Sequence, residues 1–215
     1  MPAAQSLEDL AYAAYLREHG EPLEPDGNYT EVHLSDVELE DVHAGHATFI
    51  ESAFTGVVLG GGSLERSRFS DVWISRNRWV GLRCAEAEWL DVTVLDSSLA
   101  GIEAYGSRLR RVIFQRCKID TLNLRGATVA DVEFDGCDLT ELDCGGATLT
   151  NVTFAGSAVR RARFAGAKLK KVDFRGAREL DVADGADSLR GAIVDDRQLL
   201  ELAPVLAAAL GIEVR

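Results

Sequence analysis

Residues 124–177 read LRGATVADVEFDGCDLTELDCGGATLTNVTFAGSAVRRARFAGAKLKKVDFRGA, a stretch in which an apolar or small residue recurs at every fifth position. Counted outward in steps of five, this series runs from Leu34 to Phe174 without an insertion, and no member is charged. The residue two places earlier is mostly apolar or small as well. Because side chains alternate between the faces of a strand, each unit predicts a three-residue strand followed by a two-residue corner, often glycine. A period of five does not keep one face of a helix, which excludes helices here.

A second period, of 20 residues, gives the number of corners in each turn of the chain. The members of this series are Val72, Val92, Val112, Val132, Val152 and Val172, with Phe114, Phe134, Phe154 and Phe174 two positions later. Residues spaced 15 apart do not share a common side-chain size, which argues against a coil of three units. Four units therefore make one coil, and the sequence predicts an all-β solenoid of about seven four-sided coils, with a narrow, filled core that leaves no cavity for a small substrate.

The five-residue units resemble those of the pentapeptide repeat family. They include ATVAD from Ala127, CDLTE from Cys137, ATLTN from Ala147 and AKLKK from Ala167. The resemblance implies a right-handed quadrilateral parallel β-helix over residues 32–176. Residues 1–31 are then an N-terminal helix with an acidic lead-in, and residues 177–215 a C-terminal capping or dimerisation segment.

Both ends of an open coil need caps, and the sequence offers a short helix for each. Ser6 to Asp9 resembles a capping box and precedes apolar residues at helical spacing, which predicts an α-helix at about 6–19. Asp195 or Asp196 is expected to cap a second helix with a kink or break at Pro204. Its apolar residues either cap the last coil or also form the interface of a homodimer about a twofold axis. These candidate interface residues are Leu199, Leu202, Val205, Leu206 and Leu210.

No residue set with catalytic, cofactor-binding or metal-binding spacing emerges, so we expect a protein that is not an enzyme. His33, His43 and His46 lie close together without a completing ligand and predict a solvated surface. Cys117 and Cys137 fall one coil apart in an inward column, where small core fillers are expected.

Two further features concern packing and location. Trp79 and Trp89 point inward within one coil beside Asn77, which predicts local widening or a bulge. The chain has no apolar run long enough to span a membrane and no leader pattern at its start, so a cytoplasmic protein is expected.

Charge is unevenly distributed along the 215 residues, whose formal net charge is −12. Residues 1–31 contribute −6, residues 32–176 contribute −2 and residues 177–215 contribute −4. Acidic residues dominate the first coil, and basic residues cluster between Arg160 and Arg175. An acidic surface argues against direct binding of nucleic acid.

Two outward surfaces are candidates for a protein partner. One is a corner column of acidic residues, interrupted by Arg111: Glu51, Asp71, Asp91 and Asp131. The other is an apolar face made by Trp73, Leu95 and Ile113 on successive coils, with Val58 and Val80 on the next face.

The family resemblance implies a non-enzymatic rod that binds protein. The type it resembles acts as a dimeric, acidic mimic of DNA, binds DNA gyrase or topoisomerase IV, and protects against fluoroquinolones or other gyrase poisons. The alternative is a scaffold for some other protein partner.

Overall fold

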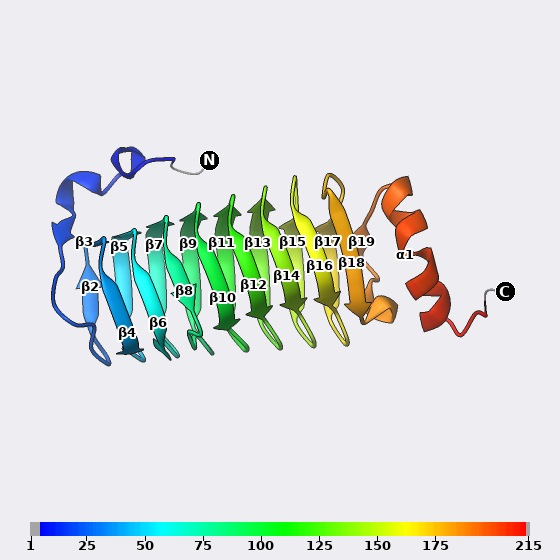
Figure 1. Ribbon diagram of the computed structural model, residues 1–215, viewed down its shortest axis with the longest axis horizontal. Helices are drawn as coiled ribbons and strands as arrows, with labels where there is room; N and C mark the ends of the chain where they lie inside the picture. The colour runs from blue at the N-terminus through cyan, green and yellow to red at the C-terminus, as the bar shows by residue number, and fades with distance from the viewer. Residues whose placement is uncertain (1–4, 214–215) are drawn as a thin grey trace.

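The computed structural model describes residues 5–213, and most of them wind into parallel coils stacked along one axis (Figure 1). Two parallel sheets form the walls, one of eleven strands and one of eight. The strands of the first sheet are β1 (Arg17–Glu18), β2 (Asn28–Thr30), β3 (Val32–Ser35), β5 (Thr48–Thr55), β7 (Arg68–Ser75), β9 (Glu88–Leu95), β11 (Arg108–Gln115), β13 (Thr128–Asp135), β15 (Thr148–Thr153), β17 (Lys168–Asp173) and β19 (Ala192–Ile193). Those of the second are β4 (Glu38–His43), β6 (Val58–Ser63), β8 (Arg78–Val80), β10 (Ser98–Glu103), β12 (Lys118–Asn123), β14 (Asp138–Asp143), β16 (Ala158–Arg163) and β18 (Glu179–Asp184).

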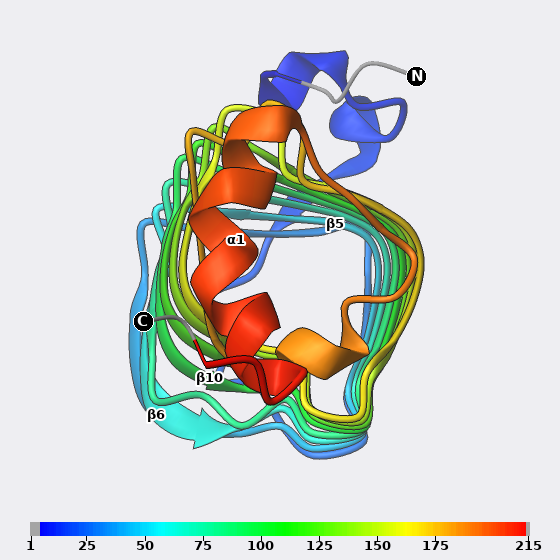
Figure 2. The same cartoon turned by 90° about the vertical axis from the view of Figure 1, so that its right-hand side faces the viewer.

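Each coil is four-sided, and successive coils are in register at 20 residues from β3 to β17, whereas the register shifts between β16 and β18. Val132 pairs with Val152, for example, and Leu122 with Leu142. Viewed along the axis, the strands form one ring with four sides (Figure 2). The second sheet has one strand in each coil and therefore eight coils. This exceeds the predicted seven because β4 and β18 both belong to the ladder, and pairing extends from Asn28 to Ile193.

The corners are made by residues in the left-handed backbone conformation. Gly56 has φ 66°, and glycine adopts this conformation without the steric cost that a Cβ adds. Corners without glycine adopt it too, as at Glu51 with φ 47°, where the chain bends in the middle of β5. The ladder on both sides of such a corner holds the residue in place, so the predicted corner position is confirmed even where glycine is missing.

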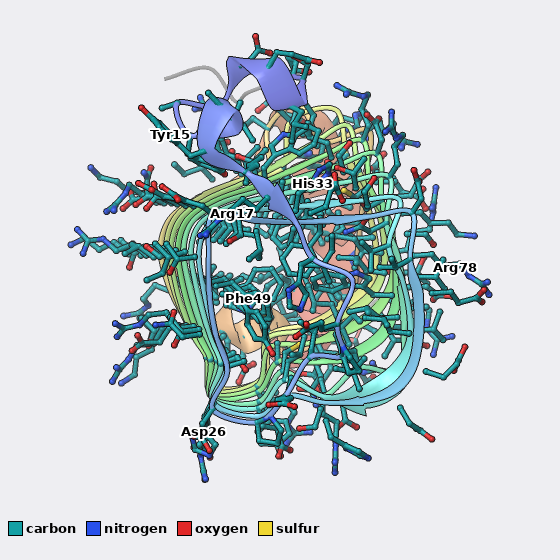
Figure 3. The ribbon with its side chains drawn as sticks, turned by 90° about the vertical axis from the view of Figure 1, so that its left-hand side faces the viewer. Tyr15, Arg17, Asp26, His33, Phe49 and Arg78 are labelled. Atoms are coloured by element: carbon teal, nitrogen blue, oxygen red, sulfur yellow. The ribbon has the colours of Figure 1, made fainter. Side chains whose placement is uncertain are left out.

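The core is a column of stacked side chains. Phe114, Phe134, Phe154 and Phe174 stack with ring centroids 4.8–5.1 Å apart, as the 20-residue period predicts. At the other end Tyr29, Phe49 and Phe69 form a second stack on the adjacent side. In Figure 3 the side chain of Phe49 lies inside the ring of strands, whereas Arg78 points outward. Stacked aromatic rings therefore fill a large part of the core at both ends of the rod, which keeps the packing dense.

The coil that contains both Trp79 and Trp89 is irregular, as predicted. The two indoles are 6.2 Å apart, and β8 is shortened to Arg78–Val80 where its neighbours β6 and β10 have six residues. Beyond it only an isolated bridge at Arg83 continues the ladder. The interruption therefore lies in the coil that holds both indoles, and β8 itself stays in register with β6 and β10.

Small polar residues face inward at two corners and serve the backbone. The Ser157 hydroxyl accepts the N–H of Cys137 at 2.9 Å and donates to the carbonyl oxygen of Phe134 at 3.0 Å. Cys117 and Cys137 occupy the same column as free thiols, and the N–H of Cys117 contacts the Cys137 sulfur at 3.4 Å. They fill the core as predicted, and they also take the place of the serines as acceptors.

The predicted N-terminal α-helix at 6–19 is wrong. Residues 5–16 form two 3₁₀ turns, η1 (Leu7–Asp9) and η2 (Ala13–Tyr15), before β1 starts. The predicted Ser6–Asp9 motif is real, because Asp9 accepts from the N–H and the hydroxyl of Ser6, both at 3.0 Å. It caps only one turn, since an isolated helix of this length is marginal and contacts with the rod decide the conformation.

Residues 17–30 close the N-terminal end of the coil instead. The Tyr29 ring lies between His19 and Phe49, and Leu23 is buried beside them. The N–H of Glu24 donates to the Tyr29 hydroxyl at 2.7 Å. The segment expected to be an irregular lead-in is thus the cap.

The C-terminal cap is helix α1 (Asp196–Ala209), which crosses the open end of the last coil (Figure 2). Asp195 is its N-cap and accepts the N–H of Gln198 at 2.8 Å, as predicted. The 3₁₀ turn η3 (Ala186–Ser188) precedes it. Of the expected kink or break at Pro204, the break does not occur, because α1 is continuous through the proline. Pro204 has no N–H to donate to the carbonyl of Leu200, a residue on the exposed side of the helix.

Candidate functional site

The apolar face predicted around Trp73 is not exposed, which corrects the sequence-based expectation. Ala53, Trp73 and Leu95 form a small buried cluster outside the main core. The side chains that cover it are Leu7, Leu10 and Leu16. Ile113, the third predicted member, is half-buried, as is Val58, and only Val80 is well exposed.

Residues 5–16, which we call the strap, run along the outside of the rod. Gln5 reaches Gln115, with 2.9 Å between their amide groups, and the Tyr12 hydroxyl lies 3.4 Å from the carbonyl oxygen of Ser52. Partial burial raises the pKa of Tyr12, and the nearby carboxylates of Asp71 and Glu51 raise it further. The strap therefore lies beside the acidic corner column as well as over the apolar cluster.

The acidic column occupies one corner, as predicted, but its members differ in their pairing. Arg111 binds Asp91 with two contacts of 2.6 Å, so the arginine that interrupts the column neutralises its neighbour. These hydrogen bonds lower the pKa of Asp91. Asp131 accepts from the Asn151 amide at 2.7 Å. Glu51 and Asp71 are exposed near the strap.

The net charge of a coil changes along the rod, and its sign alternates in the second half. Residues 31–50 carry five acidic residues and no lysine or arginine, and residues 51–90 are balanced. Residues 131–150 carry six acidic residues and no basic one, between two coils with a basic excess. Arg125 on one side and Arg160 and Arg161 on the other pair with this acidic coil. In the acidic coil at residues 31–50 the one ion pair with lysine or arginine among the described residues is the 3.9 Å contact of Glu31 with Arg17.

The C-terminal end exposes apolar residues of α1. Leu202 is buried against the last coil, and Val205 and Leu206 are half-buried there. Leu199 and Leu210 face outward, with 50% and 77% of their surface exposed. A groove of about 390 Å³ lies between α1 and residues 186–194. Its lining on the helix includes Leu199, Leu202, Leu206 and Leu210. Three of the five predicted interface residues thus cap the coil, and two are free for another contact.

The described part of the chain contains no grouping of His, Cys, Asp and Glu that could hold a metal ion. His33 is half-buried between Glu18 at 2.8 Å and Thr55 at 3.0 Å, so it is less solvated than expected. Burial raises the pKa of the Cys84 thiol to about 12, and burial beside Cys117 raises that of Cys137. Among residues 5–213 no helix is long and apolar enough to cross a membrane.

Comparisons with known proteins identify the type of repeat. Residues 87–164 match the family model described as a pentapeptide repeat region. A search of curated proteins found no match.

Solved structures with related coils differ widely in sequence. A trypsin-treated form of QnrB1, a plasmid-mediated fluoroquinolone resistance protein, is 14% identical over 88% of this chain and 100% of that chain, with a TM-score of 0.35. HetL from the cyanobacterium Nostoc sp. strain PCC 7120, a pentapeptide repeat protein involved in heterocyst differentiation regulation, is 17% identical over 80% and 91%, with a TM-score of 0.27. At these scores the likenesses carry no argument about function.

The repeat, the coil and the family model agree on the region between residues 87 and 164. The five-residue pattern and the strand ladder continue on both sides of it without a change of register, from β3 to β17. Residues 87–164 therefore belong to the pentapeptide repeat family, and they form the middle of one continuous pentapeptide-repeat rod.

Proposed function

We propose that this chain is a non-enzymatic, protein-binding rod whose acidic N-terminal end docks on a basic surface of a partner protein. One observation carries the proposal: residues 1–50 hold ten of the twelve net negative charges. In the coil at residues 31–50 the one ion pair with lysine or arginine among the described residues is that of Glu31 with Arg17 at 3.9 Å, whereas the acidic coil at residues 131–150 is paired from both sides. Complementary charge of this kind guides and orients association.

The pentapeptide resemblance makes DNA gyrase or topoisomerase IV the first partner to test, with this end acting as a mimic of DNA. Duplex DNA carries one negative charge per about 1.7 Å of its axis. Five acidic residues within one coil, which advances about 4.8 Å, reach a similar density. The balanced coils that follow do not, so the mimicry would be confined to the N-terminal end. Protection against fluoroquinolones or other gyrase poisons, and a cytoplasmic location, would follow from such binding.

A supercoiling assay with purified gyrase tests this partner. The full chain is expected to inhibit supercoiling or to reduce poison-stabilised cleavage at micromolar concentration, and added salt should weaken the effect. The informative variant is Glu38→Gln with Glu40→Gln, which removes two exposed charges from the first coil. The matched control is Asp120→Asn with Glu133→Gln, which removes two exposed charges from the middle of the rod. Equal activity of both variants would exclude docking by the acidic end, and inactivity of the unaltered chain would exclude gyrase.

The alternative, a scaffold for a different protein, is favoured by the mixed charge of the middle coils. For either partner we also propose a homodimer through α1, because Leu199 and Leu210 flank an apolar groove that one copy leaves open.

A further inference from the structure

The strap is held on the rod by few contacts. Leu7, Leu10 and Leu16 are each only half-buried, although the Trp73 and Leu95 side chains beneath them are almost fully covered. The backbone donors of residues 9, 10, 13, 15 and 16 bond to carbonyl oxygens within the strap. Regular backbone pairing with the rod starts only at Arg17, whose N–H donates to Glu31 at 2.8 Å. In the described residues the strap thus rests on the rod through side chains, and regular backbone pairing holds it at its C-terminal end.

The strap also fails to fill the surface that it covers. A cavity of about 390 Å³ lies between Gln5–Glu8 and the wall of the rod. Its lining on the rod side includes Trp73, Thr55 and Ser75, three residues that are at most 7% exposed. This space is open at the surface, so it is a groove beside the strap and not a void in the core. The face can accept more atoms than the strap provides.

One charge at the edge of this cavity, that of Arg76, acts on Asp96 only at longer range. Within the described residues Arg76 makes no ion pair, although its side chain lines the cavity. Asp96, the nearest carboxylate on the wall, is held by Arg116 through contacts of 2.7 and 2.9 Å. Glu8 of the strap lines the same cavity without pairing with Arg76. An incoming carboxylate would find an available guanidinium there.

We propose that the face formed by Ala53, Trp73 and Leu95 is a docking site for an acidic, leucine-bearing segment of a partner protein, and that the strap occupies it when the partner is absent. The leucines of the strap show which side chains the face accepts. A tethered segment has an effective concentration in the millimolar range, so weak contacts are enough to keep it bound. A partner segment that also fills the cavity and pairs with Arg76 gains contacts that the strap leaves unmade. This site is separate from the acidic end and does not rest on the function proposed above.

A labelled peptide with the sequence of residues 1–18 serves as the probe, and its binding to the full chain is measured by fluorescence anisotropy. In the variant Leu7→Ser with Leu10→Ser the strap is loosened, and we expect the peptide to bind at least about tenfold more tightly than to the unaltered chain. Adding Trp73→Ala should abolish this binding. Adding Arg76→Gln should leave the binding of this peptide unchanged, because the strap makes no ion pair with Arg76. Val80→Ser, on a different face, is the control and should leave binding unchanged.

Three results would overturn the proposal. The first is equal, weak binding of the peptide to the loosened and unaltered chains when both keep the same circular dichroism and melting temperature. The second is loss of the β spectrum in the loosened variant, which would make the strap a structural part of the fold. The third is a concentration-dependent dimer of the unaltered chain that the leucine changes abolish, which would identify the strap of a second copy as the occupant.

Discussion

The backbone N–H of Val57 donates a 2.7 Å hydrogen bond to Oδ1 of Asn77, which lies one coil further along the same interior corner. The N–H of Asn77 is accepted in turn by the Ser97 hydroxyl at 3.0 Å. Each of these coils therefore needs a side-chain hydrogen-bond acceptor at this corner for the backbone N–H of the coil before it. Asparagine supplies it but adds an amide nitrogen, and Nδ2 of Asn77 is buried without a partner. An unsatisfied buried donor is costly, so this position is a weak point of the rod.

Asn77→Ser is expected to raise the free energy of unfolding by about 1 kcal/mol, because serine keeps the acceptor and removes the orphaned donor. Asn77→Val should have the opposite effect, since it leaves the Val57 N–H without an acceptor. Chemical denaturation of the three proteins measures both changes. A stability loss in Asn77→Ser equal to that in Asn77→Val would show that Nδ2 has a partner in solution.

Arg111→Gln is expected to destabilise the rod slightly and in a pH-dependent way. The folded-state pKa of Asp91 is lowered by Arg111, so this pairing stabilises the fold near neutral pH. The contribution is lost as the pH falls through that lowered pKa and Asp91 becomes protonated. We expect the melting temperature to fall by about 1–2 °C at pH 7, and the variant and the unaltered chain to converge at acidic pH. Arg110→Gln on the same strand is the comparison, because Arg110 acts on Asp91 only at longer range and should matter less; an equal loss there would contradict the assignment.

Gln198→Ala should weaken the C-terminal cap. The Gln198 side chain is fully buried, and its Nε2 donates to the carbonyl oxygen of Phe174 at 2.7 Å. Removing it leaves an end carbonyl of the last coil without a donor, with an expected cost of about 1–3 kcal/mol. Leu200→Ala, at a position that is 76% exposed, is the comparison and should change stability little. Hydrogen exchange of β17 would show whether the loss is local, as expected, and an unaffected last coil would contradict this role.

Leu199→Glu with Leu210→Glu should convert the proposed dimer into a monomer without unfolding it, because both side chains face away from the coil. Light scattering at micromolar concentration measures the mass. Leu202→Glu is the contrasting variant: it puts a charge into the buried cap and should lower the melting temperature. A monomeric unaltered chain would remove the dimer and leave α1 as a cap alone.

The coil itself could be predicted from the sequence because each inward position repeats the same physical requirement. Phe134 stacks on Phe154 because the two residues are 20 positions apart in a regular ladder. The irregular coil was equally predictable, since two tryptophans in one narrow section exceed its volume. Such properties depend only on neighbours at fixed distances along the chain.

The strap could not be predicted in the same way, because its contacts have no fixed separation. Leu7 and Leu10 have helical spacing, which favoured a helix, and Trp73 and Leu95 sit at outward positions, which favoured exposure. Each prediction agreed with its own segment of sequence. Both the helix and the exposed face were wrong, because the two sets of apolar residues cover one another. The sequence did contain one indication of this contact. It has leucines outside the repeat and an outward apolar patch of similar size on the repeat, and each could bury the other.

The alternation of charge between coils also limits how the length of this rod can change. Deleting residues 131–150 would preserve the 20-residue register, but it would remove Asp143, Asp138 and Glu141, with which Arg125, Arg160 and Arg161 pair, and only Arg160 would keep a carboxylate, that of Glu179. Deleting residues 71–90, whose acidic and basic residues are equal in number, would leave the net charge unchanged. It would nevertheless remove Glu88 and bring Arg68 next to Arg108, both of which pair with that carboxylate. Coils that are equivalent in backbone shape are therefore not exchangeable, and the order of charges makes each acidic or basic coil specific to its place.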